Sequence, residues 1–335
     1  MHLLRRFMLL GLTLILLGFA GAVWWAGNEL ASPGRRTLHD YHHEFLADPA
    51  AHGASVTPFT LKDGTPCLMM EPLANGRLGE RGMKVREQLA ADPATAPLPP
   101  AGKIIGTLVL VHGRKGRKED YLLIGERLCA AGFRCLLPDM PAHGEHPVTT
   151  ITFGLRESEI PAQVLAEAAN QFHFNTQPCG LLGMSMGGAV SMHAAAREDA
   201  PWKTLVIISS FDRLDETIQN NVSQRVGAWL GPVWQWGAGI IYEHQTGIEL
   251  KDIRSDLPAS QLKIPVLMAH GTADKVIPID AGRRLYAALP AGLEKQWVEI
   301  PGADHHNVLI TDFPIYATIA RWMLNHVSPP ATLTP

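Results

Sequence analysis

Two hydrophobic patterns divide the chain. From Phe7 to Asn28 no side chain is charged, and Leu, Ile, Gly and Ala predominate. Because roughly twenty apolar residues span a bilayer as a helix, this run predicts a helix of membrane length. From Lys103 onward, short apolar runs alternate with longer segments of mixed character. That alternation predicts strands and helices in turn.

The second pattern predicts an α/β fold with a mostly parallel sheet covered by helices on both faces. The expected strands cover 104–111, 133–137, 179–182, 204–209, 264–270 and 296–300. The expected helices cover 119–131, 157–172, 186–196, 281–288 and 312–325. Between Phe211 and Leu262 the alternation stops, and a mainly helical pattern containing Trp229, Trp234 and Trp236 predicts an inserted cap.

The segment before the regular alternation is less uniform. The runs 56–61 and 67–70 flank Lys-Asp-Gly-Thr, which predicts a β-hairpin. Residues 71–102, rich in Pro, Ala and Gly, predict a long connection with one short helix. Residues 31–54 predict a solvated, lightly structured helical connector. It contains His39 and His43, but no acidic or cysteine ligand pattern completes a metal site around them.

Charges around the first helix indicate its orientation. Arg5 and Arg6 precede it, which predicts a cytoplasmic N-terminus and a translocated body. Trp24-Trp25 at its far end favour a retained anchor, since aromatic residues gather at membrane interfaces. The small residues 20–22 resemble a cleavage site, so secretion after signal cleavage is the alternative. The expected location is membrane-anchored, with the body on the non-cytoplasmic side, periplasmic if bacterial.

Composition narrows the classes of function. The 335 residues are 46% hydrophobic and 18% charged, which is typical of a globular chain with an ample core. A net charge of −3 argues against nucleic acid as a main partner. The four cysteines show no metal-type spacing. Cys129 and Cys135 are the nearest pair in an exported chain, but a disulfide between them cannot be derived from sequence.

The strongest chemical signal is the sequence Gly-Leu-Leu-Gly-Met-Ser-Met-Gly-Gly at 180–188. Ser185 stands between an apolar run and a helical stretch of small residues, with Gly183 and Gly187 two positions to either side. A strand-to-helix turn this tight requires flanking residues without Cβ atoms. The pattern predicts a strained turn presenting a nucleophilic serine.

Two further residues follow later strands in the order that a serine nucleophile requires. Asp274 lies just beyond the strand expected at 264–270, and His305 lies just beyond the one expected at 296–300. Asp304 adjoins His305, but adjacent loop residues rarely orient one another as acid and base, so Asp274 is preferred. Together these residues can supply a nucleophile, a general base and an orienting carboxylate. His306 competes with His305 for the role of base.

These motifs resemble those of the α/β-hydrolase superfamily over roughly residues 55–326. His-Gly-Thr-Ala-Asp-Lys-Val-Ile-Pro at 270–278 is similar to the acid-bearing loop, and Pro-Gly-Ala-Asp-His at 301–305 to the histidine loop. The family's spacing from the loop glycine selects His305. The resemblance implies an oxyanion hole from the backbone N–H groups of Met186 and Arg114, the latter after His112-Gly113.

The hydrophobic pattern and the resemblance together divide the chain. The pattern predicts an N-terminal signal anchor at 1–30, a connector at 31–54, a cap at about 211–262 and a tail at 327–335, and the resemblance implies an α/β-hydrolase domain at 55–326 that contains the cap. A Pro-Asp-Met-Pro-Ala-His-Gly loop from Pro138 resembles a structural family loop, but has Ala142 where glycine is usual. His143 in this loop is a weaker catalytic candidate.

The expected activity is hydrolysis of a carboxylic ester through an acyl-enzyme on Ser185, with no metal or organic cofactor. The partner is a small-molecule or lipid-like ester, and the cap tryptophans either contact its apolar group or form the cap's own core. Amide or peptide hydrolysis, lipid acyl transfer and thioester cleavage are alternatives; a non-catalytic scaffold would have no reason to keep all three residues. The basic residues 114–118 either favour an anionic group or form a solvated loop. Neither the substrate nor the oligomeric state follows from sequence.

Overall fold

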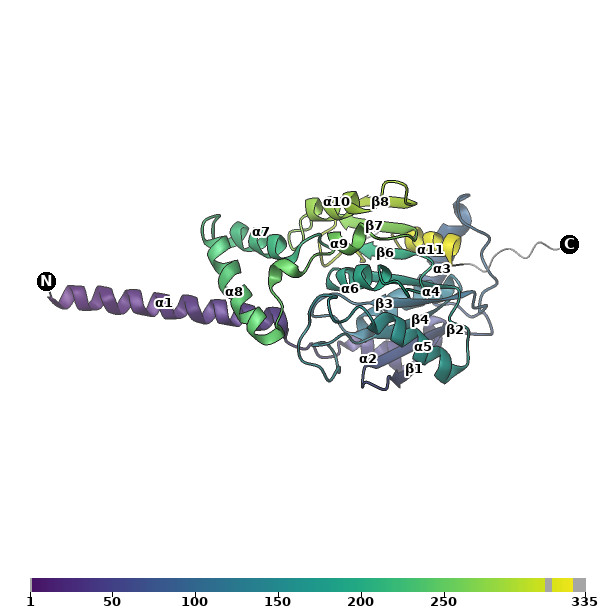
Figure 1. Ribbon diagram of the computed structural model, residues 1–335. Helices are drawn as coiled ribbons and strands as arrows, with labels where there is room; N and C mark the ends of the chain where they lie inside the picture. Colours follow the sequence, from purple (N-terminus) through teal and green to yellow (C-terminus); the bar gives the residue numbers. More distant parts are fainter. Residues whose placement is uncertain (1, 311–314, 328–335) are drawn as a thin grey trace.

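Apolar strands place one sheet in the middle of the molecule (Figure 1). The computed structural model describes residues 2–310 and 315–327. Its strands are β1 (Ala54–Thr60), β2 (Pro66–Pro72), β3 (Gly106–Val111), β4 (Phe133–Pro138), β5 (Cys179–Met184), β6 (Leu205–Ile208), β7 (Val266–Gly271) and β8 (Lys295–Ile300). They form an eight-stranded sheet in the order β1-β2-β4-β3-β5-β6-β7-β8.

The sheet is mostly parallel, as the alternation predicted. The six strands from β3 to β8 pair only in parallel with one another. β1 and β2 form the expected antiparallel hairpin, and β2 also pairs antiparallel with β4. Because parallel strands end at the same edge, the loops after β3, β5, β7 and β8 meet there. The α/β-hydrolase fold class is confirmed.

Helices cover both faces. The helices of the described residues, of which α1 extends away from the sheet, are α1 (His2–Ala31), α2 (Asp40–Ala47), α3 (Glu80–Ala91), α4 (Leu122–Ala130), α5 (Ile160–Phe172), α6 (Met186–Ala195), α7 (Leu214–Val226), α8 (Leu230–Thr246), α9 (Asp256–Ala259), α10 (Ile279–Ala288) and α11 (Ile315–His326). Single-turn 3₁₀ helices lie at Pro49–His52, Lys118–Tyr121 and Leu250–Asp252.

The core divides into two layers because strand side chains alternate between faces. Val109 and Val111 of β3 belong to the layer that includes side chains of α5, α6 and α10. Leu108 and Leu110 belong to the opposite layer, with side chains of α3, α4 and α11. Burial on both faces explains the uninterrupted apolar run 108–111 in β3.

The first helix extends away from the sheet and ends against the body (Figure 1). Leu4–Ala31 is long and apolar enough to cross a membrane, a property that anchors and signal sequences share. Its second half packs on α8 of the inserted segment, where the rings of Phe19 and Trp234 meet edge to face at 5.6 Å. At its end, the carbonyl of Ala31 accepts a hydrogen bond from the N–H of Ile151 at 2.9 Å.

Two local expectations need correction or qualification. The connector is more ordered than predicted, because His42 and Phe45 of α2 are buried and His42 lies 3.1 Å from the Asp120 carboxylate. The four cysteines are buried and free, so Cys129 and Cys135 form no disulfide.

The start expected for the last helix falls partly on 311–314, and most of the tail falls on 328–335. Both segments lie outside the described residues. The domain boundaries stay predictions.

Candidate active site

Ser185 occupies a strained turn between β5 and α6. Its backbone has φ 55° and ψ −120°, a conformation that costs a non-glycine residue free energy. A Cβ atom at Gly187 would lie 2.1 Å from the carbonyl oxygen of Val111, and one at Gly183 would lie 2.1 Å from that of Gly187. Both glycines are therefore required by close backbone approach. The strained turn expected from the sequence is present.

Ser185, His305 and Asp274 form a continuous hydrogen-bonded chain. Nε2 of His305 lies 3.1 Å from Oγ of Ser185, and Nδ1 lies 2.8 Å from Oδ2 of Asp274. Since a carboxylate only accepts, Nδ1–H donates to Asp274 and Nε2 is left to accept from the serine hydroxyl. All three residues are buried, with at most 9% of their surface exposed.

Asp274 is fixed by its own loop. Its Oδ1 accepts from the backbone N–H groups of Val276 at 2.9 Å and Ile277 at 2.8 Å. These bonds leave Oδ2 directed at His305. His270, the buried last-but-one residue of β7, lies 3.5 Å from the same Oδ2. The loop thus holds the carboxylate in one orientation.

The competing residues in the histidine loop have other partners. Asp304 accepts from the backbone N–H groups of His306 and Asn307, both at 2.8 Å, so it shapes the turn. His306 is exposed, and its ring meets that of His305 edge to face. Of the two adjacent histidines, the geometry brings His305 to Ser185.

Two backbone N–H groups are available beside Ser185. Met186 is the first residue of α6, so its N–H has no acceptor within the helix and lies at the positive end of the helix dipole. Arg114 follows Gly113, whose missing Cβ atom would lie 3.4 Å from Cβ of Ser185. Met186 and Arg114 line the same cavity as Ser185 and His305. Their role as oxyanion donors stays a prediction.

A cavity of about 470 Å³ opens over Ser185. Most of its wall is apolar, contributed by Leu30, Phe153, Met186, Phe211, Leu214, Ile218, Val222, Val276 and Ile277. Its charged lining consists of Arg36, Arg114 and Lys115. The arrangement suits an apolar group beside a carbonyl at Ser185.

All four basic residues of the loop after β3 have acidic or carbonyl partners, and the expectation of a solvated loop is wrong for Arg117 and Lys118, which are buried, whereas Lys115 is exposed. Lys118 is buried against Asp139 at 2.9 Å, and Arg117 against Glu119 at 2.5 Å. Lys115 lies 2.6 Å from a carboxylate oxygen of Glu29 in α1. Arg114 reaches the backbone carbonyl of the same residue at 2.5 Å.

The end of α1 is therefore part of the site, which sequence reasoning missed. Leu30 lines the cavity, and Glu29 holds Arg114 and Lys115 in the loop that carries the expected oxyanion donor. Nothing in the local sequence signals this, because the two partners are about 85 residues apart. The position of α1 against the body creates the contact.

Trp229 and Trp236 do neither of the things expected of the cap tryptophans, and the half-buried Trp234 packs on Phe19 of α1. Trp229, Trp234 and Trp236 are absent from the described lining of the Ser185 cavity. Trp229 is 77% exposed and Trp236 is 67% exposed, so they do not form a cap core either. The cap lines the cavity instead through Phe211 and, in α7, through Leu214, Thr217, Ile218, Asn221 and Val222.

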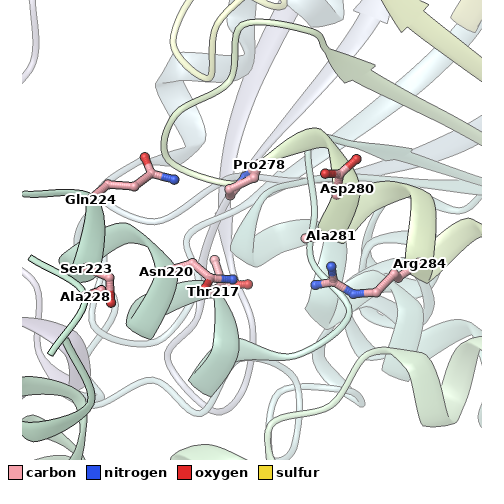
Figure 2. Close-up of a pocket in the computed structure, with 9 residues that line it drawn as sticks. All are labelled: Thr217, Asn220, Ser223, Gln224, Ala228, Pro278, Asp280, Ala281 and Arg284. Atoms are coloured by element: carbon pink, nitrogen blue, oxygen red, sulfur yellow. The ribbon is translucent and has the colours of Figure 1, made fainter.

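A second cavity, of about 420 Å³, lies on the other side of α7. Figure 2 shows its polar wall, with Asn220 and Gln224 of the cap opposite Asp280 and Arg284 of α10. Thr217 borders both cavities. The Arg284 guanidinium is paired with the Asp212 carboxylate: its Nε donates at 2.5 Å and its Nη2 at 3.0 Å. This second cavity contains none of the catalytic candidates.

The loop after β4 is structural. Ala142 has φ 68°, the left-handed conformation that explains why glycine is usual there. His143 is buried, its Nδ1 lies 2.8 Å from the carbonyl of Pro141, and burial lowers its pKa to about 3. His143 does not line the cavity over Ser185.

Comparisons with known proteins agree with this fold. A family profile described as "Serine aminopeptidase, S33" matches residues 102–257, which include Ser185 but end before Asp274. The uncharacterized protein YfhR of Escherichia coli K12 is 26% identical over 206 residues, covering 62% of this chain and 65% of YfhR. The chain thus spans about two thirds of that relative.

Solved structures share the fold. An esterase of Pyrococcus furiosus superposes with a TM-score of 0.59 at 13% identity, covering 89% of this chain and 99% of the esterase. An acylaminoacyl peptidase of Pyrococcus horikoshii gives a TM-score of 0.58 at 14% identity, over 88% of this chain and 45% of the peptidase. Neighbours of this fold therefore include enzymes named for esters and enzymes named for peptides.

The buried Lys118–Asp139 pair supports the loop next to the site, which leads to a prediction. Burial alone would raise the pKa of Asp139, but the Lys118 ammonium and other neighbours hold it below the usual value. Replacing Lys118→Met leaves a buried carboxylate without its cation and should lower the free energy of unfolding at pH 7 by about 3–5 kcal/mol.

The pH dependence has a definite sign. A depressed carboxylate pKa stabilises the native chain above the unfolded-state value, and this stability is lost as pH falls through the folded-state value. In the Lys118→Met variant, burial without the cation raises the pKa of Asp139, so this carboxylate is protonated in mild acid and the destabilisation should shrink there. Urea denaturation in mild detergent at pH 7 and pH 4 measures this, with exposed Lys84→Met as control. An equal loss for both variants would contradict the assignment.

Proposed function

The chain belongs to the α/β-hydrolase superfamily and is a serine-type hydrolase, and from that premise we propose that it cleaves carboxylic esters through an acyl-enzyme on Ser185. The observation that carries the proposal is the hydrogen-bonded chain from Ser185 through His305 to Asp274. The structural neighbours are named for different substrates, esters and peptides. The choice of an ester therefore rests on the cavity of this chain.

His305 acts as general base. Oγ of Ser185 attacks the ester carbonyl carbon while its proton moves to Nε2 of His305, 3.1 Å away. Asp274, 2.8 Å from Nδ1, holds the imidazole in the tautomer that can accept this proton and stabilises the imidazolium that forms. Because Asp274 is buried and also bound by two backbone N–H groups, its orientation is set before substrate arrives.

The oxyanion is stabilised by the backbone N–H groups of Met186 and Arg114. Such donors act on the charge that develops on the carbonyl oxygen, and removing one typically costs about 10²–10³ in kcat. His305 then donates its proton to the departing alkoxide, which leaves as the alcohol. A water molecule, deprotonated by His305, attacks the acyl carbon, and collapse of the second intermediate releases the acid and restores Ser185.

The cavity favours an apolar ester over an aminopeptidase substrate. An aminopeptidase must hold the cationic N-terminus of its peptide, which calls for a carboxylate at the site. The described lining residues include no Asp or Glu and do include Arg36, Arg114 and Lys115. Apolar side chains from α7 and from the β7 loop are suited to an acyl chain or an apolar alcohol.

The same proposal includes retention of α1 as an anchor, with the catalytic body on the non-cytoplasmic side. Phe19, which precedes the alternative cleavage site at 20–22, packs its ring on Trp234 of α8, so the part of α1 that cleavage would remove contacts the body. Residues 7–17 carry the long exposed apolar surface that a bilayer would cover. Arg5 and Arg6 precede that surface.

Anchor retention predicts the state of the native chain. The protein should be extracted from membranes by detergent and not by high salt, and its intact mass should include the residues before Val23. A reporter fused after Pro335 should be active only in the non-cytoplasmic compartment. A salt-extractable chain that starts at Val23 would contradict the anchor, and a reporter active only in the cytoplasm would contradict the orientation.

The nucleophile is tested by labelling the full chain in detergent with a fluorophosphonate. The wild type should be labelled and should hydrolyse p-nitrophenyl esters, whereas Ser185→Ala should lose the label and about 10⁴-fold or more of kcat. Ser260→Ala, an exposed serine of the inserted segment, is the control and should behave as wild type. Persistent labelling of Ser185→Ala would refute the assignment. Hydrolysis of anilides with no ester preference would instead indicate amide cleavage.

The base is tested by comparing two adjacent histidines. His305→Ala should lower kcat by about 10⁴-fold or more, because the serine loses its proton acceptor. His306→Ala should stay within about tenfold of wild type, since that ring is exposed and contacts neither Ser185 nor Asp274 through a described hydrogen bond. Steady-state rates on one p-nitrophenyl ester decide between them. The reverse ranking would show that His306 is the base.

A further inference from the structure

Helix α8 presents an exposed apolar face to its surroundings. Trp229 at its N-cap, Val233, Trp236 and Ile240 are spaced at intervals of four, three and four residues, which places them on one side of a helix. They are 77%, 48%, 67% and 46% exposed. No charged residue occurs from 230 to 242. Soluble surfaces rarely expose two tryptophans and two aliphatic side chains together.

This face continues onto α1. The two helices pack closely where glycine removes the side chain: a Cβ atom at Gly27 would lie 2.5 Å from Cβ of Ile241, and one at Gly237 would lie 2.6 Å from Cγ1 of Val23. Figure 1 shows α8 beside the body end of α1. Trp24 and Trp25, on this part of α1, are 59% and 60% exposed.

We propose that Trp24, Trp25, Trp229, Val233, Trp236 and Ile240, here named the aromatic collar, bind the lipid bilayer surface around α1. Indole rings are suited to the membrane interface, since they offer an apolar body and one N–H donor. The occupant is lipid, because the collar is continuous with a helix whose remaining exposed surface is apolar over a membrane-spanning length.

The collar places the site next to the membrane. The first helix of the cap, α7, packs on α8 and also lines the Ser185 cavity through Leu214, Ile218 and Val222. Leu30, at the end of α1, lines the same cavity. Resting on the proposed function, this indicates that the ester substrate is an amphiphile held in the bilayer, whose apolar chain enters from the collar side.

The experiment uses the full chain reconstituted in vesicles of phosphatidylcholine and phosphatidylglycerol. An environment-sensitive dye is attached at Trp236→Cys and, as control, at Lys103→Cys. Labelling is selective because the four native cysteines are buried. Lys103 is exposed and precedes the amino end of β3, at the sheet edge opposite Ser185. Bromine-bearing lipids should quench the dye at position 236 at least twofold and leave position 103 unchanged.

Equal, weak quenching at both positions would overturn the proposal. A second contrary outcome is weak quenching of the position 236 dye by lipid, combined with self-quenching that increases with the amount of protein per vesicle. That result would show the face to be covered by a second copy of this chain. Neither readout requires catalysis, so the outcome for the collar is independent of the proposed function.

An activity arm tests the link to the substrate. The double variant Trp229→Ser/Trp236→Ser should lose about tenfold of its rate on a long-chain fluorogenic ester dissolved in the vesicles, and keep its rate on a soluble butyrate ester. Leu257→Ser, which removes an exposed apolar side chain of α9, should change neither rate. An unchanged long-chain rate in the double variant would refute delivery through the collar. Absence of both activities in wild type would refute the proposed function instead.

Discussion

Close backbone approach at Gly187 is the constraint on which the site depends. The carbonyl of Val111, at the end of β3, lies where a Cβ atom at this position would be. That contact brings the loop after β3 against the start of α6 and holds Ser185 at a positive φ between them. The strain is tolerated because the surrounding strands fix both ends of the turn: the N–H of Ser185 donates to Ile208 of β6, and its carbonyl accepts from Ser210.

The remaining parts of the site follow from the same edge of the sheet. β7 and β8 lie next to one another, so the loops that follow them carry Asp274 and His305 to within a hydrogen bond. Neither residue depends on long side-chain reach, since each comes directly after its strand. This explains why an arrangement spread over 120 residues is geometrically tight.

These features were readable from the sequence because their signals are local. An apolar run shows a strand, a glycine pair shows a forced turn, and the order of Ser185, Asp274 and His305 shows which loops meet. Features set by packing between distant segments were not readable. From sequence, Lys118 is expected to be solvated, but the fold brings Asp139 and Glu145 to it. Trp236 is a candidate core residue from sequence, but it is exposed on α8. Glu29 and Leu30 gave no signal because their partners lie far along the chain.

The contact between α1 and the loop after β3 links attachment to chemistry. Glu29 supplies a carboxylate to Lys115 and a backbone carbonyl to Arg114, in a loop whose backbone is proposed to stabilise the oxyanion. Without Glu29, Arg114 and Lys115 would lose the carboxylate beside them at the cavity wall, and the half-buried Arg114 would also lose a backbone acceptor. A body cut free of α1 would therefore differ from the native enzyme in the shape of its cavity and in the charge beside its reacting carbonyl. On the proposed function, α1 forms part of the active-site wall as well as tethering the enzyme to the membrane.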